Sequence, residues 1–273
     1  MRLALFNLDC LATHDVIRSF IMEHRADIAV VGLSPPFRAA RGGFVGQSAY
    51  HLYNSGSDFS NFLACNFVLP RLAGAFQQLM PSSGVPTLSG LCAELGIPVI
   101  RIDDVNEPSV LAELARLNVD LIVSCYFDQI FKGPIIALPR YGAYNIHTSL
   151  LPMNRGPMPV IHGAVAEPAS LGVTVHRIDQ DIDTGAIVAQ ESYAPHATET
   201  VLQMMRALHR RGLELLMAKL PDVVRDAAEL RPQSAGSYES FPSRATLRAL
   251  KRRGRKLFDF GDLRAAIRTP VGI

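Results

Sequence analysis

The sequence predicts a doubly wound α/β fold, in which helices flank a mostly parallel, twisted sheet. Apolar runs of strand length alternate with helix-like stretches through most of the chain, and this β-α-β-α order is typical of such a fold. Several runs are almost continuously apolar, as expected for parallel strands covered on both faces. The chain has 273 residues, of which 48% are hydrophobic and 19% charged, and this is ample for one sizeable core.

The expected elements follow one another in a regular order. Strands are predicted at Leu3–Phe6, Ile28–Val31, Pro98–Ile102, Asp120–Ser124, Gly142–Ile146, Val173–Ile178 and Ala186–Gln190. Helices are predicted at His14–His24, Leu88–Leu95, Pro108–Leu117 and Met158–Ala166. After Pro195 the pattern changes to one helix, from Glu199 to about Leu220, followed by a polar segment and a basic, helix-like tail. We therefore divide the chain into a main domain, residues 1–195, and a C-terminal helix with a basic tail, residues 196–273.

Residues 33–84 interrupt this alternation. The segment contains the adjacent Pro35 and Pro36, a glycine-rich RGGFVG and an aromatic-rich stretch, and we expect it to carry its own helix from Phe59 to about Leu79. It is too long for an ordinary βα loop. Long loops at the carboxyl ends of strands commonly shape substrate sites. Two interpretations stay open: a lid over a substrate site, and a helix packed over the sheet edge.

Composition and motifs disfavour several classes of function. The net charge of +2 gives no whole-protein reason to expect nucleic acid as a partner. No G-x-G-x-x-G follows the first strand, so a nicotinamide enzyme is disfavoured. No run approaches the roughly 18 consecutive apolar residues of a membrane span. We expect a protein that contacts no membrane.

The four cysteines are Cys10, Cys65, Cys92 and Cys125. They are far apart in the sequence and form no C-x-x-C pair, so the sequence predicts neither a zinc site nor a thioredoxin-like motif. A reduced, cytoplasmic chain that needs no metal is the interpretation that fits best.

The stretch 144-YNIHTSLLP-152 carries the strongest signal of chemistry. Successive side chains of a strand point to opposite faces, so Asn145 and His147, two residues apart, lie on the same side. A second stretch, 178-IDQDIDTGAIV-188, lies one crossover further along the chain and offers three acids, Asp179, Asp181 and Asp183, the last in a D-T-G turn. Its loop can meet the first stretch at one edge of the sheet.

Asn, His and Asp together suit the addition of an amine to a carbonyl group. The Asn amide and the His ring can donate to a developing oxyanion, while Asp with His can handle the amine protons. No serine nucleophile is required, and Ser149 lacks the G-x-S-x-G elbow. Each residue alone also has a structural interpretation, as a core histidine, a backbone cap or a common turn. The combination and its spacing carry the hypothesis.

The chain resembles the formyltetrahydrofolate-dependent formyltransferases, the group that contains methionyl-tRNA, glycinamide ribonucleotide and sugar N-formyltransferases. The resemblance is carried by N-I-H-x-S-L-L-P-x-x-R-G together with D-x-x-x-D-T-G, and extends over about Leu88 to Leu220. It implies a Rossmann-like formyltransferase fold, with a short C-terminal extension here, and 10-formyltetrahydrofolate as co-substrate. It also implies catalytic roles for Asn145, His147 and Asp183.

By the same resemblance, the pterin ring of the folate lies against two loops. The first follows the strand Asp120–Ser124, and the second runs from Asp179 to Asp183. The implied cofactor-binding residues are Tyr126, Phe127, Ile130, Asp179 and Asp181. Core packing is the alternative role for Tyr126 and Phe127. Arg155 is expected either to bind an acceptor phosphate or to hold its own loop, and a solvated surface arginine without a specific role is the alternative.

The acceptor stays open, because residues 33–84 depart from the family pattern and would lie at the acceptor site. Transfer to a small primary amine, with a nucleotide-linked amino sugar as the first candidate, is the leading hypothesis. Formylation of methionyl-tRNA is an alternative that the basic tail 244–256 could support, although a solvated helix is the favoured interpretation of that tail. Hydrolysis of formyltetrahydrofolate and non-catalytic folate binding are further alternatives. The oligomeric state is open, with a homodimer as one option.

Overall fold

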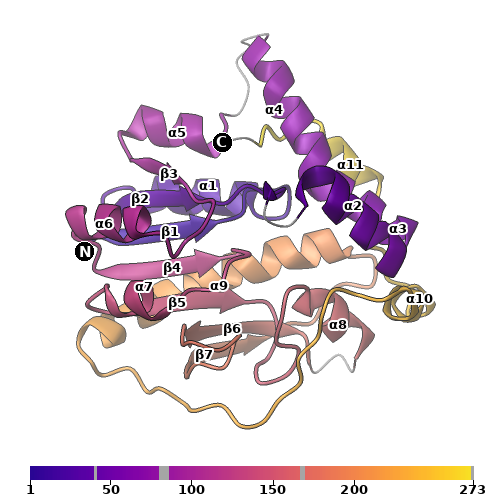
Figure 1. The fold of residues 1–273 in the computed structure, drawn as a ribbon. Coiled ribbons are helices and arrows are strands. Elements are labelled where there is room, and N and C mark those ends of the chain that lie inside the picture. The colour runs from indigo at the N-terminus through magenta and orange to yellow at the C-terminus, as the bar shows by residue number, and fades with distance from the viewer. Residues whose placement is uncertain (40–41, 80–85, 167–169, 272–273) are drawn as a thin grey trace.

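The computed structural model describes residues 1–39, 42–79, 86–166 and 170–271. Its centre is a seven-stranded sheet with the order β3-β2-β1-β4-β5-β6-β7 (Figure 1). The strands are β1 (Leu3–Asn7), β2 (Ile28–Leu33), β3 (Val99–Arg101), β4 (Leu121–Cys125), β5 (Ala143–His147), β6 (Gly172–Arg177) and β7 (Ile187–Ser192). All seven predicted strands are therefore confirmed, with ends that differ by at most two residues.

The sheet is mostly parallel, as predicted. The pairs from β3 to β5 are parallel, whereas β6 runs antiparallel to β5, and β7 antiparallel to β6. The strand order reverses between β1 and β4, because the chain adds β2 and β3 on one side before it returns to add β4 on the other. In a doubly wound sheet, ligands bind at the carboxyl ends of the strands beside such a reversal.

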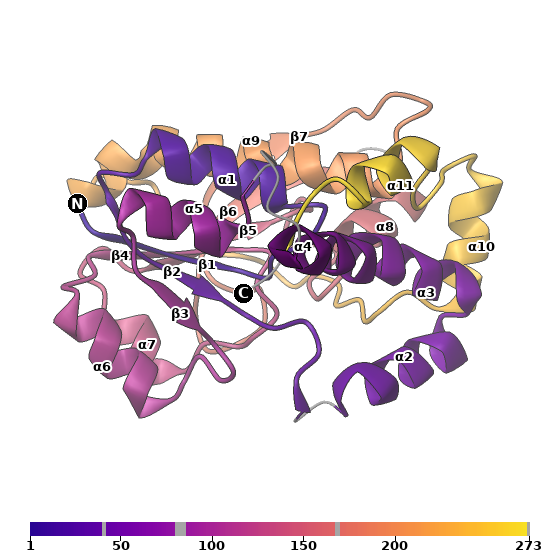
Figure 2. The ribbon, with the colours of Figure 1, turned by 90° about the horizontal axis from the view of Figure 1, so that it is seen from above.

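Two hydrophobic cores cover the two faces of the sheet. Successive side chains of β1 point alternately into one core and into the other. Leu3 and Leu5 belong to the larger core, whereas Ala4 and Phe6 belong to the smaller one. The larger core contains α1 (His14–Glu23), α5 (Leu88–Leu95), α8 (Pro159–Val165) and α9 (Val201–Val224). The smaller core contains α6 (Pro108–Arg116) and α7 (Gly133–Ala137). Figure 2 shows these two helical layers on opposite sides of the sheet.

Helix α9 is part of the main structure and packs on β5, β6 and β7. It begins with a capping box, in which Thr200 and Gln203 each accept a hydrogen bond from the backbone N–H of the other. Its close approach to the sheet needs Gly212, because a Cβ there would lie 2.2 Å from Ile146 Cγ2. The helix that stands behind β5 thus fixes the strand that carries Asn145 and His147.

The interruption of the α/β pattern folds into helices beyond the carboxyl ends of the strands (Figures 1 and 2). They are α2 (Gly43–Asn54), α3 (Ser57–Leu63), a π-helical turn η2 (Ala64–Val68) and α4 (Leu69–Leu79). The helix predicted from Phe59 to Leu79 is thus found as α3, η2 and α4. Helix α2 was not predicted, because its sequence begins with glycines that disfavour helix. Residues 40–41 and 80–84 of this segment lie outside the described part of the chain.

The inserted helices are fastened to the loop after β1. Asn66, in the π turn, accepts a hydrogen bond from Ala12 N at 2.9 Å through its side chain, and its carbonyl accepts another from Leu11 N. Arg71 donates to the carbonyl oxygen of Asp9 at 2.9 Å. These contacts hold the insertion over the end of the sheet, where the strand order reverses.

The C-terminal part of the chain also lies beyond the carboxyl ends of the strands (Figures 1 and 2). A long irregular segment leads from α9 to α10 (Arg244–Arg252), and α11 (Phe260–Ala266) follows. Leu247 and Leu250 are the buried side chains of α10, which contacts α8. Arg244 donates to the carbonyl of Leu52, and Arg253 to that of Ala166.

Within the described residues, no helix is long and apolar enough to cross a membrane. The cysteines Cys10, Cys65, Cys92 and Cys125 are all buried and unpaired.

Candidate active site

Asn145 and His147 lie on the same face at the carboxyl end of β5, as the two-residue spacing predicts. His147 is buried, whereas Asn145 is partly exposed. Neighbouring β6 runs antiparallel and places His176 directly opposite Asn145, and Thr174 directly opposite His147. Four polar side chains therefore share one face of two adjacent strands.

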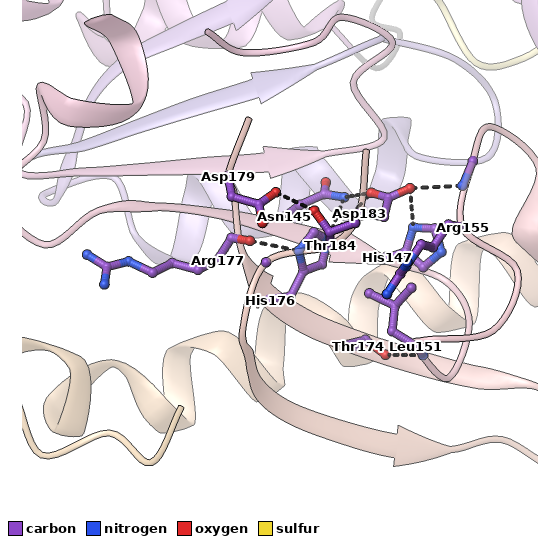
Figure 3. Close-up of polar contacts among 12 residues, drawn as sticks. Asn145, His147, Leu151, Arg155, Thr174, His176, Arg177, Asp179, Asp183 and Thr184 are labelled. Carbon is purple, nitrogen blue, oxygen red and sulfur yellow. Dashed lines mark hydrogen bonds and ion pairs between the residues drawn. The ribbon is translucent and has the colours of Figure 1, made fainter. Parts of the chain in front are cut away.

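Asp183 reaches these strands from the loop between β6 and β7 (Figure 3). Its Oδ1 accepts a hydrogen bond from Asn145 Nδ2 at 3.3 Å, and its Oδ2 lies 3.5 Å from His147 Nδ1. Gly156 donates its backbone N–H to the same Oδ2 at 2.9 Å. The structure thus brings together the three residues for which the sequence predicts catalytic roles.

The segment that follows α9 holds the D-T-G turn, Asp183–Gly185, through hydrogen bonds. Gln233 donates to the carbonyl oxygens of Asp183 and Gly185, at 3.0 and 2.7 Å. Arg155 in turn donates to Gln233 Oε1 at 2.9 Å. Of the interpretations open for Arg155, these contacts favour that of holding the loop.

His176 is a fourth member of this group that the sequence interpretation missed. Its Nε2 lies 3.2 Å from Asn145 Nδ2 and 3.5 Å from Asp183 Oδ1. Its Nδ1 lies 2.8 Å from the carbonyl of Arg177, so Nδ1 carries the proton and Nε2 can accept one from Asn145. The signal was present in Val-Thr-Val-His, where Thr174 and His176 alternate on one face, but only the strand register places them opposite Asn145 and His147.

Asp183 is ionised in this setting. Burial alone would raise the pKa of its carboxyl group, but His147, His176 and the N–H of Gly156 together outweigh that effect, so this pKa lies well below its usual value. The site therefore holds one buried negative charge against two histidines.

The His147 ring is uncharged and has one free lone pair. Burial holds its pKa below the usual value, and the charge of Asp183 opposes this only in part, so the ring is neutral near pH 7. Nε2 lies 3.0 Å from the carbonyl oxygen of Asn154, which can only accept, so Nε2 carries the proton. The free lone pair is then on Nδ1, the atom that faces Asp183. Proton uptake at Nδ1 would create an ion pair with that carboxylate.

Ser149 has a structural role. Its hydroxyl donates to the carbonyl of Met153 at 2.8 Å, and its own carbonyl accepts from Thr174. The side chain is 1% exposed. These contacts agree with the expectation that the chemistry needs no serine nucleophile.

The polar group opens into a cavity of about 930 Å³ at the carboxyl ends of β1, β4 and β5. This volume is near the upper end of the range of roughly 300–1,000 Å³ for small-molecule sites, so two reactants can share it. Its walls include Asn145, His147, His176 and Asp183. They also include all five residues predicted to bind folate, which are Tyr126, Phe127, Ile130, Asp179 and Asp181.

Tyr126 packs deeply in the loop after β4. Its ring stacks on Phe67 of the π turn, with 6.4 Å between centroids, and meets His209 of α9 edge-on at 5.3 Å. Phe127 contacts Phe6 and Phe131 in the smaller core. Both rings therefore pack into the core while they also line the cavity; folate binding by them stays a prediction.

The inserted helices form another wall of the cavity. The lining residues from this segment include Phe44, Gln47, Ser48, Tyr50 and His51 of α2, Ser60 and Leu63 of α3, and Ala64, Phe67 and Val68 of η2. Tyr238 and Phe241 of the C-terminal segment also line it. Residues distant in the sequence thus enclose the polar group together.

A glycine keeps the Asp183 hydrogen bond in place, and its replacement should be costly. Gly156 has φ +112°, and a Cβ there would lie 2.2 Å from the carbonyl oxygen of Glu239. We expect Gly156→Ala to lower the free energy of unfolding by more than about 2 kcal/mol, because strain and a backbone clash add. Urea denaturation measures this loss.

Gly254→Ala is the matched control. Gly254 also has a positive φ, of +73°, but no atom lies within 4 Å of the added Cβ. The control should lower the free energy of unfolding by only about 1 kcal/mol, because backbone strain acts there without a clash. Equal losses in the two variants would show that the turn at Gly156 adjusts freely.

Comparison with known proteins assigns the region that carries these polar side chains to a protein family. Residues 89–220 match the family model described as "Formyl transferase", and this range contains Asn145, His147, His176 and Asp183. This part of the chain belongs to the formyl transferase family. The chain also matches a methionyl-tRNA formyltransferase of Chloroflexus aggregans, with 33% identity over 163 residues. That match covers 60% of this chain and 52% of the relative, so the chain spans about half the length of the curated relative.

Solved formyltransferases share the fold. A sugar N-formyltransferase from a Shewanella species superimposes with a TM-score of 0.53 and 17% identity, over 88% of this chain and 77% of that one. An N-formyltransferase from Helicobacter canadensis, in complex with folinic acid and dTDP-3-aminofucose, gives a TM-score of 0.52 and 14% identity. That superposition covers 100% of this chain and 83% of the Helicobacter protein. The predicted formyltransferase fold is confirmed.

Proposed function

We propose that the protein transfers the formyl group of 10-formyltetrahydrofolate to the primary amine of a small molecule. The observation that carries this proposal is the contact of Asp183 with both Asn145 and His147 at the wall of one large cavity. Membership of the formyl transferase family supports the reaction type. No metal is required, since hydrogen-bond donors can stabilise the oxyanion.

The reaction begins when the amine nitrogen attacks the formyl carbon. A C–N bond forms and the carbonyl oxygen becomes an oxyanion, which Asn145 stabilises by donating an N–H. Both N–H groups of Asn145 are engaged in the unliganded chain, one with His176 and one with Asp183. Asn145 therefore gives up one of these two contacts when the oxyanion forms.

Proton transfer completes the reaction. His147 Nδ1 takes a proton from the attached amine, directly or through one water, and Asp183 stabilises the imidazolium that results. The bond between the formyl carbon and N10 of the folate then breaks. The departing N10 receives the proton, so that tetrahydrofolate and a formamide are the products, and His147 returns to its neutral form.

The pterin ring is proposed to lie between the loop after β4 and the loop 179–183. Tyr126, Phe127 and Ile130 offer apolar surface for a flat ring, and Asp179 and Asp181 offer acceptors for its N–H groups. We expect Ile130→Asp to weaken folate binding by roughly tenfold or more, because a charge replaces apolar surface. Isothermal titration with tetrahydrofolate measures it.

Ile267→Asp is the control for that variant. Ile130 is 53% exposed and lines the cavity, whereas Ile267 is 61% exposed and lies at the end of α11, outside the cavity lining. The control should bind tetrahydrofolate with unchanged affinity. Unchanged affinity in Ile130→Asp as well would place the pterin elsewhere.

An amine on a sugar is the first acceptor to test. The Helicobacter protein of the same fold was solved with dTDP-3-aminofucose. Methionyl-tRNA is the second candidate, since the curated relative acts on it by name. The basic tail gives it little support, because Arg244, Arg253 and Arg255 donate to backbone carbonyls of this chain.

Incubation with 10-formyltetrahydrofolate and a panel of amines tests the proposal. Release of tetrahydrofolate together with a mass gain of one formyl group on an amine is the expected result. Formate release without any amine would favour hydrolysis instead. Salt-sensitive inhibition by bulk tRNA would favour the tRNA alternative.

The proposed base makes a pH dependence predictable. The folded pKa of His147 lies below its usual value of 6.5, so the ring stays neutral and active as a base to lower pH than an exposed histidine. We expect kcat/KM to be flat near pH 7 and to fall only as the pH drops below 6.5. Initial rates between about pH 5 and 8 measure it; an acid limb centred above 6.5 contradicts this role.

A further inference from the structure

Helix α2 presents both apolar and polar side chains to the cavity. Phe44, Gln47 and His51 follow one another at intervals of three and four residues, so they lie on the same side of the helix. All three line the cavity. The outer side of the helix carries Val45 and Tyr53, which are 77% and 81% exposed and do not line it.

Two polar groups on this face have no partner within the described chain. They are Gln47 Nε2 and His51 Nδ1, and both atoms are buried. The His51 side chain is only 8% exposed, and burial lowers its pKa, so its ring is neutral near pH 7. Buried donors and acceptors are nearly always satisfied. Because both residues line the cavity, a ligand bound there can supply the missing partners.

Aromatic rings surround these two groups. The His51 ring is held edge-on by Phe241, Tyr50 and Phe59, with centroids 4.7, 5.2 and 5.4 Å away. At the rim, Phe44, Tyr50 and Tyr238 are 52%, 52% and 57% exposed while they line the cavity. A cluster of exposed aromatic side chains around a cavity is typical of a ligand-binding surface.

Among the described residues, the aspartate, glutamate, lysine and arginine side chains that line the cavity are all aspartates. Asp128, Asp179, Asp181 and Asp183 belong to its lining, which includes no lysine or arginine among the described residues. Arg38 lies close by but pairs with Asp128 at 2.8 Å. A wall of this kind attracts an ammonium group and repels a phosphate.

We propose that α2 recognises the acceptor, and that the acceptor is a primary amine with an uncharged body, a ring or chain that carries hydroxyl or carbonyl groups. This inference rests on the proposed formyl transfer and specifies its second substrate. Gln47 donates to an oxygen of the acceptor, His51 donates to or accepts from a second polar group, and the rings of Phe44, Tyr50 and Tyr238 pack on its apolar surface. Phosphorylated amines, including nucleotide-linked sugars such as the dTDP-3-aminofucose of the Helicobacter protein, are discriminated against, so the inference narrows the sugar acceptors to those without a phosphate.

Binding measurements separate this inference from the reaction itself. We would titrate the protein, saturated with tetrahydrofolate, with two pairs of amines: phenyl glucosaminide against glucosamine 1-phosphate, and tyramine against tyramine phosphate. In at least one pair the uncharged amine should bind roughly tenfold or more tightly. Tighter binding of the phosphorylated members, or no binding of either uncharged amine, overturns the inference. Absence of formyl transfer to an amine that does bind overturns the proposed function instead.

A pair of variants tests the role of α2. His51→Phe keeps an aromatic ring against Phe241 and removes the polar atoms, whereas Tyr53→Phe removes a hydroxyl from the outer side of the same helix. We expect His51→Phe to raise KM for the amine roughly tenfold, with little change in kcat or in tetrahydrofolate affinity. Tyr53→Phe should match the wild type. If His51→Phe leaves KM unchanged, or lowers kcat and folate affinity together, then His51 only supports the fold and the inference is wrong.

If His51→Phe fails to fold, Gln47→Leu gives the same test. Gln47 is partly exposed and has a similar size to leucine. Loss of its N–H should raise KM for the uncharged amine severalfold without affecting folate affinity. An unchanged KM in this variant overturns the inference on its own.

Discussion

Replacing Asp183 by asparagine should lower kcat by roughly a thousandfold while tetrahydrofolate still binds. The amide keeps the shape of the carboxyl group but has no charge, so an imidazolium at His147 loses the partner that lies 3.5 Å from Nδ1. Single-turnover kinetics measure the chemical step, and titration measures folate affinity. Near-normal turnover in this variant would show that Asp183 does not handle charge in the reaction.

Two controls make the result specific. Asp222→Asn removes a carboxylate from an exposed pair with Arg225 and should leave turnover unchanged. The double variant Asp183→Asn with His147→Ala should be little slower than the slower single variant, because residues that act as a unit are not additive.

The same substitution should change the acid stability of the fold. The pKa of Asp183 is lower in the folded chain than its usual 3.8, so its contribution to stability is complete above that value and is lost as the pH falls through the folded pKa. Unfolding free energies of Asp183→Asn should therefore fall less steeply than those of the wild type below about pH 4.

Replacing Asn145 by alanine should lower kcat by about two to three decades with little change in KM. A donor aimed at the oxyanion stabilises the transition state more than the bound substrate, and loss of one such donor costs about 100- to 1000-fold. Steady-state kinetics with 10-formyltetrahydrofolate and an accepted amine measure both constants. Asn61→Ala, on the exposed side of α3, is the control and should have no effect.

A different outcome would identify Asn145 as a structural residue. If Asn145→Ala mainly raised KM, or lowered the stability of the fold enough to explain the lost activity, the amide would serve to link His176 with Asp183. Thermal unfolding of the variant distinguishes these cases.

Local sequence patterns predicted the parts of the fold that depend on local rules. The alternation of apolar runs and helix-like stretches predicted all seven strands and helices α1, α5, α6 and α8 but not α2 or α7. The strands were predictable because burial on both faces dictates near-continuous apolar runs. The strand period placed Asn145 and His147 on one face. Asp183 required the resemblance to a family, since no local rule says which of three acids in the loop turns inward. The catalytic roles of these residues remain predictions.

The sequence by itself determined the sheet, most of its flanking helices and the pair Asn145 and His147. Only the tertiary structure decided that His176 lies opposite Asn145, because the register of an antiparallel pair depends on contacts between segments distant in the sequence. It likewise decided that α2 forms and turns Gln47 and His51 toward the cavity. Helix propensity is low at the glycines where α2 begins, and the contacts that hold it, with α3, Phe241 and Arg244, come from other parts of the chain. Local propensity acts over a few residues, whereas a binding cavity is made by packing, and packing depends on the whole chain.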